Sequence, residues 1–406
     1  MSASTETLVK LRGLTAEGKS KANVTVPTMS HRKYKNAHSF NMRVNKINAL
    51  SGVSFEGNYN FQLPAFQQIV GEAWIEMTLP ALSVGTYRKN PLLHVVDTIT
   101  YRAGQKFYEF CPRKDLPILL NRCKDKAMKD QLMALFVDKT GALSQAGGTY
   151  ILPLITPMSI WHTDRLSQPI KHGNRNSGLW DGAKLADNLL IEIQFASGAN
   201  ACSEAPTFTS AANLGNVVLR WEEVVAAPAV LTAIRREIPS YYCIEEFTRL
   251  EDLVVSDAST TVYKVASLVS RAGTTGFYFR SRPVAADTTS LNCMAGNEHI
   301  KSLVVRCDGR DIYSTDDRTD DQRAYQNILA GDPGATGEPK FAHFSFGNTH
   351  RNFDAATVGS LLKNGACNEL DLEIQSETGD DRLDIVAVHL RSFVFADRTV
   401  KVSNAY

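Results

Sequence analysis

The sequence predicts an all-β protein that consists of two copies of one antiparallel β-sandwich. Three observations lead to this prediction. Short runs rich in β-branched and aromatic residues recur along the 406-residue chain, separated by Gly, Asn, Pro and Ser. Long helical patterns do not alternate with these runs, as they would in a parallel α/β sheet. Segments of the first half also reappear in the same order in the second half, which indicates an internal duplication.

The predicted strands follow one another in both halves of the chain. Those of the first half are 69–79, 92–102, 149–155, 189–195 and 216–225, and those of the second half are 243–255, 261–270, 299–307, 340–346, 368–376 and 383–395. Several of them alternate apolar and polar residues. In the run 217–225, Val217, Leu219 and Trp221 share one face of the strand, which we expect to pack into a core.

Two segments predict helices. Between 115 and 136, apolar residues recur every three or four positions, with Asp115 as the predicted N-cap and Pro117 in the first turn. The segment 319–332 begins with Thr and Asp and is followed by Pro333, which stops a helix. We expect both helices to serve packing.

The internal repeat consists of three matches in the same order. Residues 99–108 match 304–313 and share a Gly and a Tyr, 189–195 match 370–376, and 217–225 match 386–394 by alternation alone. The first match predicts that Gly104 and Gly309 occupy equivalent turns between paired strands.

The repeat and the charge pattern together divide the chain into four parts. The predicted division is a basic N-terminal arm (1–48), a first β-domain (49–228), a linker with a short helix (229–239) and a second β-domain (240–406).

The N-terminal arm carries most of the charge asymmetry of the chain. Residues 1–46 contain nine Lys or Arg and two Glu, so their net charge is +7, and the rest of the chain carries +1 − 7 = −6. The candidate partner-contact residues in this arm are Arg32, Lys33, Lys35, Arg43 and Lys46. The arm is either a solvated tail or an electrostatic contact with nucleic acid, anionic lipid or an acidic partner, and the sequence leaves these alternatives open.

The segments that we considered for catalysis and for cofactor or metal binding do not fit the motifs that such sites need. The Gly-rich stretch 331–340 has a Lys nearby but lacks the adjacent Gly-Lys-Ser/Thr of a phosphate loop, and no Gly-x-Ser-x-Gly elbow and no HxH or HExxH pair occurs in the sequence. We therefore expect a protein that is not an enzyme and binds neither a cofactor nor a metal. The seven cysteines are scattered and unpaired in spacing, and the first residues lack an apolar signal region, so we also expect reduced thiols and folding inside the cell.

Several segments together resemble a known family, the double jelly-roll major capsid proteins of icosahedral double-stranded DNA viruses, including membrane-containing phages, virophages and nucleocytoplasmic large DNA viruses. The resemblance extends over about 90–400 and rests on five segments, 102–110, 149–161, 219–251, 307–325 and 341–348. They are similar to the family's turn before the first helix, its Pro-Leu strand, its inter-domain crossing, its second turn and helix, and a late strand.

The resemblance implies two tandem eight-stranded jelly rolls and a homotrimer that forms a pseudo-hexagonal tile of a virion shell, assembled inside the host cell. It implies as partners other trimers, minor capsid and penton proteins and an internal membrane surface, but no specific nucleic-acid sequence. Loops 162–188 and 197–215 would then form the outer surface. Two alternatives remain: a minor capsid component of the same fold, such as a penton or spike base, and a double β-sandwich that binds or cleaves carbohydrate.

Overall fold

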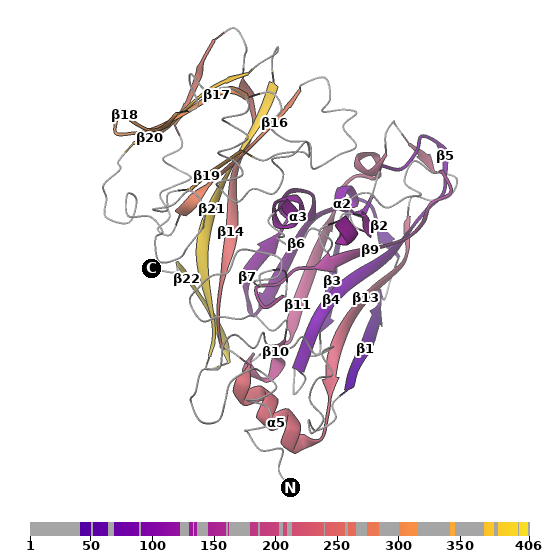
Figure 1. The fold of residues 1–406 in the computed structure, drawn as a ribbon. Helices are drawn as coiled ribbons and strands as arrows, with labels where there is room; N and C mark the ends of the chain where they lie inside the picture. Colours follow the sequence, from indigo (N-terminus) through magenta and orange to yellow (C-terminus); the bar gives the residue numbers. More distant parts are fainter. Residues whose placement is uncertain are drawn as a thin grey trace.

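The computed structural model describes a large part of the chain (Figure 1). The described residues are 41–49, 52–63, 69–88, 91–121, 130–132, 134–135, 145–159, 161, 179–185, 187–202, 206–208, 213–238, 240–255, 259–264, 274–283, 300–314, 342–345, 369–376, 381–396 and 398–404. The predicted helix 319–332 lies outside them, as do Arg32, Lys33 and Lys35.

The first domain is a sandwich of two antiparallel sheets. One sheet contains β1 (Asn41–Asn48), β13 (Asn213–Val225) and β4 (Ile69–Leu79) in this order, with β9 (Gly148–Leu154) and β10 (Trp180–Asp181) on the other edge of β4 and β2 (Val53–Ser54) on β13. The other sheet has the order β3 (Asn58–Leu63), β11 (Leu189–Phe195), β6 (Val96–Ala103), β7 (Gln105–Phe110). The short strands β5 (Leu82–Val84) and β12 (Thr207–Phe208) pair with each other.

The second domain repeats this arrangement. One sheet has the order β14 (Tyr241–Val255), β21 (Asp381–Ala396), β16 (Thr274–Pro283), β19 (Ala342–Ser345), and β22 (Thr399–Asn404) pairs with β21. The other sheet has the order β15 (Thr261–Lys264), β20 (Leu370–Ser376), β17 (Ile300–Cys307), β18 (Arg310–Ser314).

Each domain is a jelly roll. When the eight principal described strands of a domain are numbered in chain order, one sheet holds strands 1, 8, 3 and 6 and the other holds strands 2, 7, 4 and 5. This order is the same in both domains and results from two successive Greek keys. The predicted fold class, two tandem eight-stranded jelly rolls with short helices in the connections, is therefore confirmed.

Each sandwich has its own hydrophobic core. In the first, Val217, Leu219 and Trp221 are buried as predicted, and Ile75 and Met77 of β4 face the same core. In the second, the core contains Val305, Ile374, Ile385 and Ala387 together with Phe277. The period-two alternation of these strands places one face in the core, as expected for half-buried strands.

The structure corrects the residue alignment of the repeat around its turns. Arg102 lies opposite Leu190, and Arg306 lies opposite Asp371 at the corresponding place of β20. Arg102 therefore corresponds to Arg306, whereas the sequence alignment matched Arg306 with Tyr101. The difference arises because two residues, Asp308 and Gly309, form the second turn, while Gly104 alone separates the strands of the first.

The third match of the repeat is also one residue out of register. β13 and β21 do occupy the same place in their sheets. Val217 faces the core of the first sandwich, whereas Val386, its match, lies on the outer face of its sheet next to Ile118. Because side chains alternate between the faces of a strand, a shift of one residue exchanges core and outer positions.

The two turn glycines predicted to be equivalent both have a left-handed backbone. The φ angles are 72° at Gly104 and 76° at Gly309. We expect Gly104→Ala and Gly309→Ala each to destabilise the protein by about 1 kcal/mol, because an L-residue is strained there. The Cβ of an alanine at position 104 would lie 2.9 Å from Oδ2 of Asp187, the end of an exposed side chain that can move away, and at position 309 it would meet nothing within 4 Å, so the two losses should be of the same order. Urea denaturation of both variants measures the losses, and an unchanged stability of either variant would contradict the prediction.

Strand β1 corrects the predicted boundary of the N-terminal arm. Residues 41–48, which we assigned to the arm, pair along their whole length with β13. The strand was missed because Arg43, Lys46 and the three Asn residues obscure its alternation. Strands β3, β16 and β22 were also not predicted.

Helix α2, which precedes β6, and helix α3, which follows β7, both differ from the prediction for these segments. Leu92–Val95 form a helical turn, α2, where a strand was predicted. Helix α3 (Pro112–Asn121) begins three residues before Asp115, whose side chain accepts a hydrogen bond from the Cys111 backbone N–H. Pro112 thus takes the first-turn position that we assigned to Pro117. Leu116, Leu119 and Leu120 are buried, but Leu135 is exposed.

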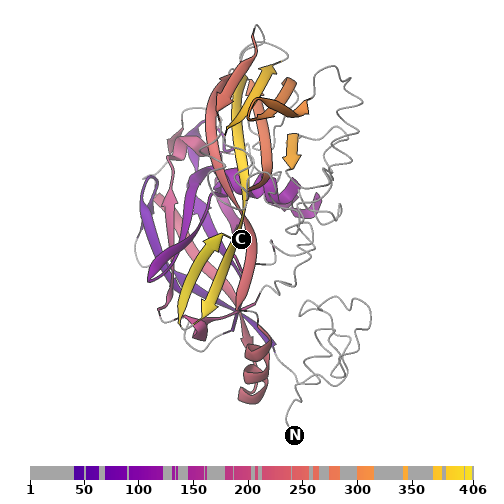
Figure 2. The ribbon, with the colours of Figure 1, turned by 90° about the vertical axis from the view of Figure 1, so that its left-hand side faces the viewer.

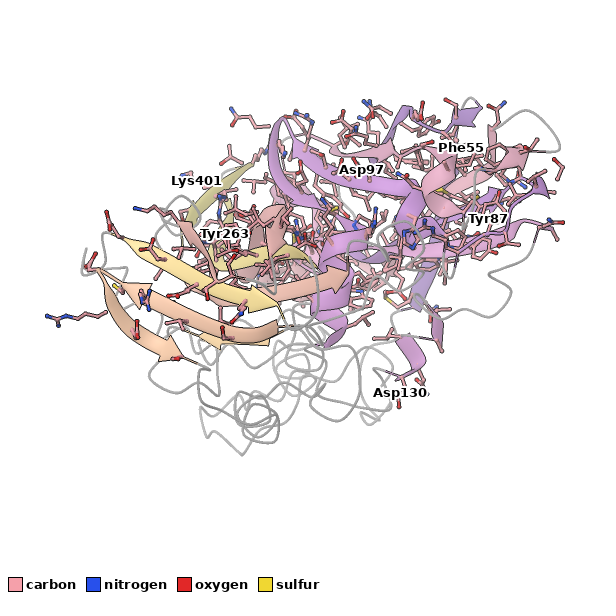
Figure 3. All side chains as sticks on the ribbon, turned by 90° about the horizontal axis from the view of Figure 1, so that it is seen from above. Phe55, Tyr87, Asp97, Asp130, Tyr263 and Lys401 are labelled. Carbon is pink, nitrogen blue, oxygen red and sulfur yellow. The ribbon has the colours of Figure 1, made fainter. Side chains whose placement is uncertain are left out.

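The described parts of the loops 162–188 and 197–215, which we expected to form the outer surface together, do not share one surface. Asp181 of the first loop contacts Arg235 of α5 (Pro228–Glu237) at the foot of the molecule in Figure 1. In the second loop, Phe208 stacks on Phe55, which Figure 3 places at the end of the first sandwich far from the second domain. The expectation of a single outer surface built by both loops is wrong for these parts.

The cysteines also depart from the expectation of reduced thiols. Cys307 is disulfide-bonded. Cys111 and Cys202 are free and buried, and burial raises the pKa of the Cys202 thiol to about 11. Pairing depends on two cysteines meeting in space, which their spacing in the sequence does not reveal.

Candidate assembly surfaces

Two long strands connect the domains. β14 has 15 residues and β21 has 16, and they pair from Tyr241 and Val394 at one end to Val255 and Asp381 at the other. The end with Val255 and Asp381 lies in the second sandwich. The end with Tyr241 and Val394 runs, together with β22, alongside the first sandwich (Figures 1 and 2). The second domain therefore extends directly over the side of the first.

An aromatic cluster fills the contact between these strands and the first domain. Phe393 lies edge-on to Tyr108 of β7 with ring centroids 6.0 Å apart, and Phe395 does the same to Phe107 at 6.0 Å. Tyr242 of β14 is 5.5 Å from Phe395. All five residues belong to the hydrophobic core of the first sandwich. Burial holds the pKa of the Tyr108 hydroxyl well above its ordinary value, so this hydroxyl stays uncharged at physiological pH.

Helix α3 forms a second contact, with the outer face of the β14-β21 sheet. Ile118 packs against Val386 and Val388, and Phe247 lies beside them. Arg249 of β14 forms an ion pair with Asp115 of α3, and both side chains are largely buried, with exposed fractions of 16% and 7%. Apolar packing and a shielded ion pair thus fix the orientation of one jelly roll relative to the other.

Helix α5 closes the foot of the first sandwich and leads into β14. Its residues Val230 and Ile234 pack against Ile69 and Val224 at the end of the sheet. Arg235 lies 3.3 Å from a carboxylate oxygen of Asp181. The predicted linker 229–239 thus coincides largely with a packed helix and acts as a rigid corner.

The candidate contact residues of the arm fall into two groups. Arg32, Lys33 and Lys35 lie outside the described residues, and their role stays a prediction. Arg43 and Lys46 are on β1, on opposite sides of the sheet. Arg43 Nη2 lies 2.8 Å from Oε2 of Glu223 on the neighbouring strand, whereas Lys46 is exposed on the outer face.

The outer face around Lys46 contains residue types that are common at protein interfaces. Arg220 lies directly opposite Lys46 on β13 and opposite Trp74 on β4. Arg220 Nε is 2.6 Å from Glu76 Oε1, and the Trp74 indole N–H donates to the same carboxylate at 3.3 Å. Val44, two residues before Lys46, is 50% exposed. This surface was not predicted, because Trp74 and Arg220 appear in the sequence only as strand residues and Val44 lies in the segment that we assigned to the arm.

Two other kinds of feature do not occur in the part of the chain that the structure describes. No group of three or more His, Cys, Asp or Glu side chains that could hold a metal ion occurs among the residues the structure describes. In the same part of the chain, no helix is both long and apolar enough to cross a membrane.

The chain matches known proteins in structure but not in sequence. No family model matches the chain, and no curated protein matches it in sequence. The fold is similar to that of the PBCV-1 protein VP54, as fitted into a cryo-EM reconstruction of the virophage Sputnik, with a TM-score of 0.63, 13% identity and coverage of 91% of this chain and 98% of that chain. It is also similar to the Faustovirus major capsid protein (TM-score 0.57, 9% identity, coverage 96% and 97%).

A third solved structure, of the Sputnik virophage by cryo-EM, matches with a TM-score of 0.56, 11% identity and coverage of 94% of this chain and 93% of that chain. In each comparison the match extends over both domains, because more than nine-tenths of either chain is covered. The chain therefore has the double jelly-roll fold of the viral capsid proteins to which it is similar.

Proposed function

We propose that the protein is the major capsid protein of an icosahedral virus, with a structural rather than a catalytic role in the virion shell. The observation that carries the proposal is the match of both jelly rolls, in the same chain order, to capsid proteins over nearly their whole length. The chain is thus about as long as the capsid proteins it resembles. The rigid joint between the domains is a second observation that supports the proposal.

The rigid joint suits a building block of a shell. Two jelly rolls held by the aromatic cluster and the Asp115–Arg249 pair present a fixed pair of similar units. Three such chains supply six similar units, which is the number that a pseudo-hexagonal tile requires. A hinge between the domains would instead give tiles of variable shape.

We expect the recombinant protein to be a homotrimer with about three times the chain mass of 44.7 kDa. Size-exclusion chromatography with light scattering measures this mass, and negative-stain electron microscopy should show hexagonal particles. A monomer at micromolar concentration would contradict the proposal and favour the carbohydrate-binding alternative. A five-fold ring would favour the penton alternative.

The proposal also includes the contacts that a trimer would make with other components of the shell. Trimers would meet edge to edge in a lattice, and minor capsid or penton proteins would complete the shell. The basic residues before β1, including Arg32, Lys33 and Lys35, would contact an acidic protein surface or an internal membrane. Their replacement by Gln should weaken this contact in a salt-dependent way.

Two truncations separate the role of the arm from that of β1. Deletion of 1–40 should leave the trimer and the melting temperature nearly unchanged but reduce the yield of closed particles, because β1 remains intact. Deletion of 1–48 removes eight backbone pairs with β13 and should unfold the first sandwich. Thermal denaturation and particle counts of both variants test this. If deletion of 1–40 already unfolds the trimer, the arm belongs to the fold and our account of it is wrong.

A further inference from the structure

We propose that an array of polar side chains, repeated on the outer surface of both jelly rolls, binds the same array on a neighbouring copy of this chain. This repeated array consists of one Arg, one Glu and one Gln in each domain: Arg102, Glu192 and Gln194 in the first, and Arg306, Glu373 and Gln375 in the second. The inference rests on the proposed function. It names a contact between neighbouring trimers, which is separate from the contacts that hold one trimer together.

In the first domain, the repeated array lies on the outer face of the sheet β3-β11-β6-β7. The side chains of β11 alternate between core and surface, which places Glu192 and Gln194 on the surface. Arg102 Nε of β6 lies 2.9 Å from Glu192 Oε2, and the Thr98 hydroxyl donates to Gln194 Oε1 at 3.2 Å. The side chains of Arg102 and Glu192 are 41% and 29% exposed, so a partner can reach both charges.

The second domain carries the repeated array at the corresponding places. β20 takes in its sheet the position that β11 takes in the first domain, and Glu373 and Gln375 lie on its outer face. Arg306 of β17 forms an ion pair with Glu373, and its Nε lies 2.6 Å from Asp311 Oδ1. The side chains of Arg306 and Glu373 are 38% and 23% exposed. In Figure 1, β17, β18 and β20 lie on the side of the second domain away from the first, so this array is accessible too.

The stability of the two sheets does not require that the array be the same in both. An exposed ion pair between strands contributes little to stability. The outward positions beside the array differ between the domains, since Thr100 corresponds to Val304 and Leu190 corresponds to Asp371. The Arg, the Glu and the Gln are identical although their surroundings have diverged. This identity points to a partner that both domains share.

The chemistry of the repeated array fits a second copy of itself. Each array holds a cation and an anion side by side, together with an amide that can donate and accept hydrogen bonds. When two arrays face each other across a two-fold axis, each guanidinium meets the carboxylate of the other copy, so the contact is self-complementary. Among the described residues, Arg102 uses only its Nε toward Glu192. Its two Nη groups are therefore available for a carboxylate of the neighbouring copy.

A shell of pseudo-hexagonal tiles gives a reason for the repetition. The sides of a trimeric tile come alternately from the first and the second domain. Neighbouring tiles can therefore meet with two first domains, two second domains or one of each. An array common to both domains allows the same bonds at every such junction, whereas an array on one domain alone would serve only some of them.

The test reverses the charge of the array in two opposite ways. The acidic variant is Arg102→Glu/Arg306→Glu, and the basic variant is Glu192→Arg/Glu373→Arg. Arrays of like charge meet in either variant alone, so the attraction between trimers should be lost. An equimolar mixture brings acidic arrays against basic ones and should restore it. Static light scattering of the full chain at physiological ionic strength measures the second virial coefficient, which should be negative for the wild type and the mixture and positive for each variant.

Matched controls carry the same change in charge at exposed positions outside the repeated array. They are the acidic control Lys401→Glu/Arg236→Glu and the basic control Glu56→Lys/Asp187→Lys. Each control alone should keep the attraction of the wild type. If the controls lose the attraction alone and regain it on mixing, as the array variants do, net charge explains the effect and the inference is overturned.

The remaining outcomes separate this inference from the proposed function. If the wild-type chain is monomeric, the proposed function and the inference both fail. If the wild type is trimeric but its trimers do not attract one another, or if mixing the array variants restores nothing, the inference is overturned while the capsid proposal stands. Size-exclusion chromatography and circular dichroism check that each variant is a folded trimer. Should a reversal variant not fold, Arg102→Gln/Arg306→Gln replaces it and should reduce the attraction, and an unreduced attraction overturns the inference.

Discussion

Replacement of Phe393 by Ala should cost about 3–5 kcal/mol of stability, as the truncation of a fully buried aromatic side chain does in a core. Phe393 is 0% exposed and belongs to the second jelly roll in sequence, yet its ring packs against Tyr108 of the first. We therefore expect the substitution to weaken the joint between the domains as well as the fold. Urea denaturation measures the loss, and hydrogen exchange measures where the protein opens.

Phe277→Ala is the matched control for this prediction. Phe277 is also 0% exposed, but it lies in the core of the second sandwich alone. Both variants should lose stability of the same order, since both remove a buried phenyl ring. Only Phe393→Ala should accelerate exchange of the backbone amides of β7. Equal protection of β7 in the two variants would mean that the aromatic cluster does not couple the domains.

Replacement of Arg249 by Ala should also be severe, at about 3–5 kcal/mol, because it leaves a buried carboxylate without its cation. Asp115 accepts a hydrogen bond from the Cys111 backbone N–H, but it would lose the guanidinium of the other domain. The double variant Asp115→Leu/Arg249→Met should recover much of this loss, since paired apolar residues can replace a buried ion pair. Urea denaturation of the single and double variants tests the coupling.

An exposed ion pair provides the comparison. Lys106 and Glu109 form a pair on β7 whose side chains are 48% and 45% exposed. Lys106→Ala should therefore cost less than about 1 kcal/mol. If Arg249→Ala is equally mild, water reaches the contact between α3 and β14, and the Asp115–Arg249 pair does not hold the domains together.

The prediction of strands succeeded where burial imposes a period of two. Ile69–Leu79 and Leu189–Phe195 have the predicted bounds, because each has one face in a core and carries its alternation plainly. Prediction failed where the alternation is obscured. In β1, polar residues occupy both faces of an edge strand, so composition favoured an arm. The helical turn at Leu92–Val95 is buried on all sides, and a short apolar run does not distinguish helix from strand.

The sequence by itself determined the fold class, the duplication and the turn glycines, because these depend on local pattern and on backbone conformation. Only the tertiary structure decided the register of the repeat, the extension of β14 and β21 along the first domain, and the pairing of Arg249 with Asp115. Each of these joins residues far apart in the chain, and their energy comes from burial that neither segment has alone. The same reason explains the outer face around Lys46: the sequence shows Trp74 and Arg220 only as strand residues and Val44 only as part of a basic segment, and the sheet brings all three to one face.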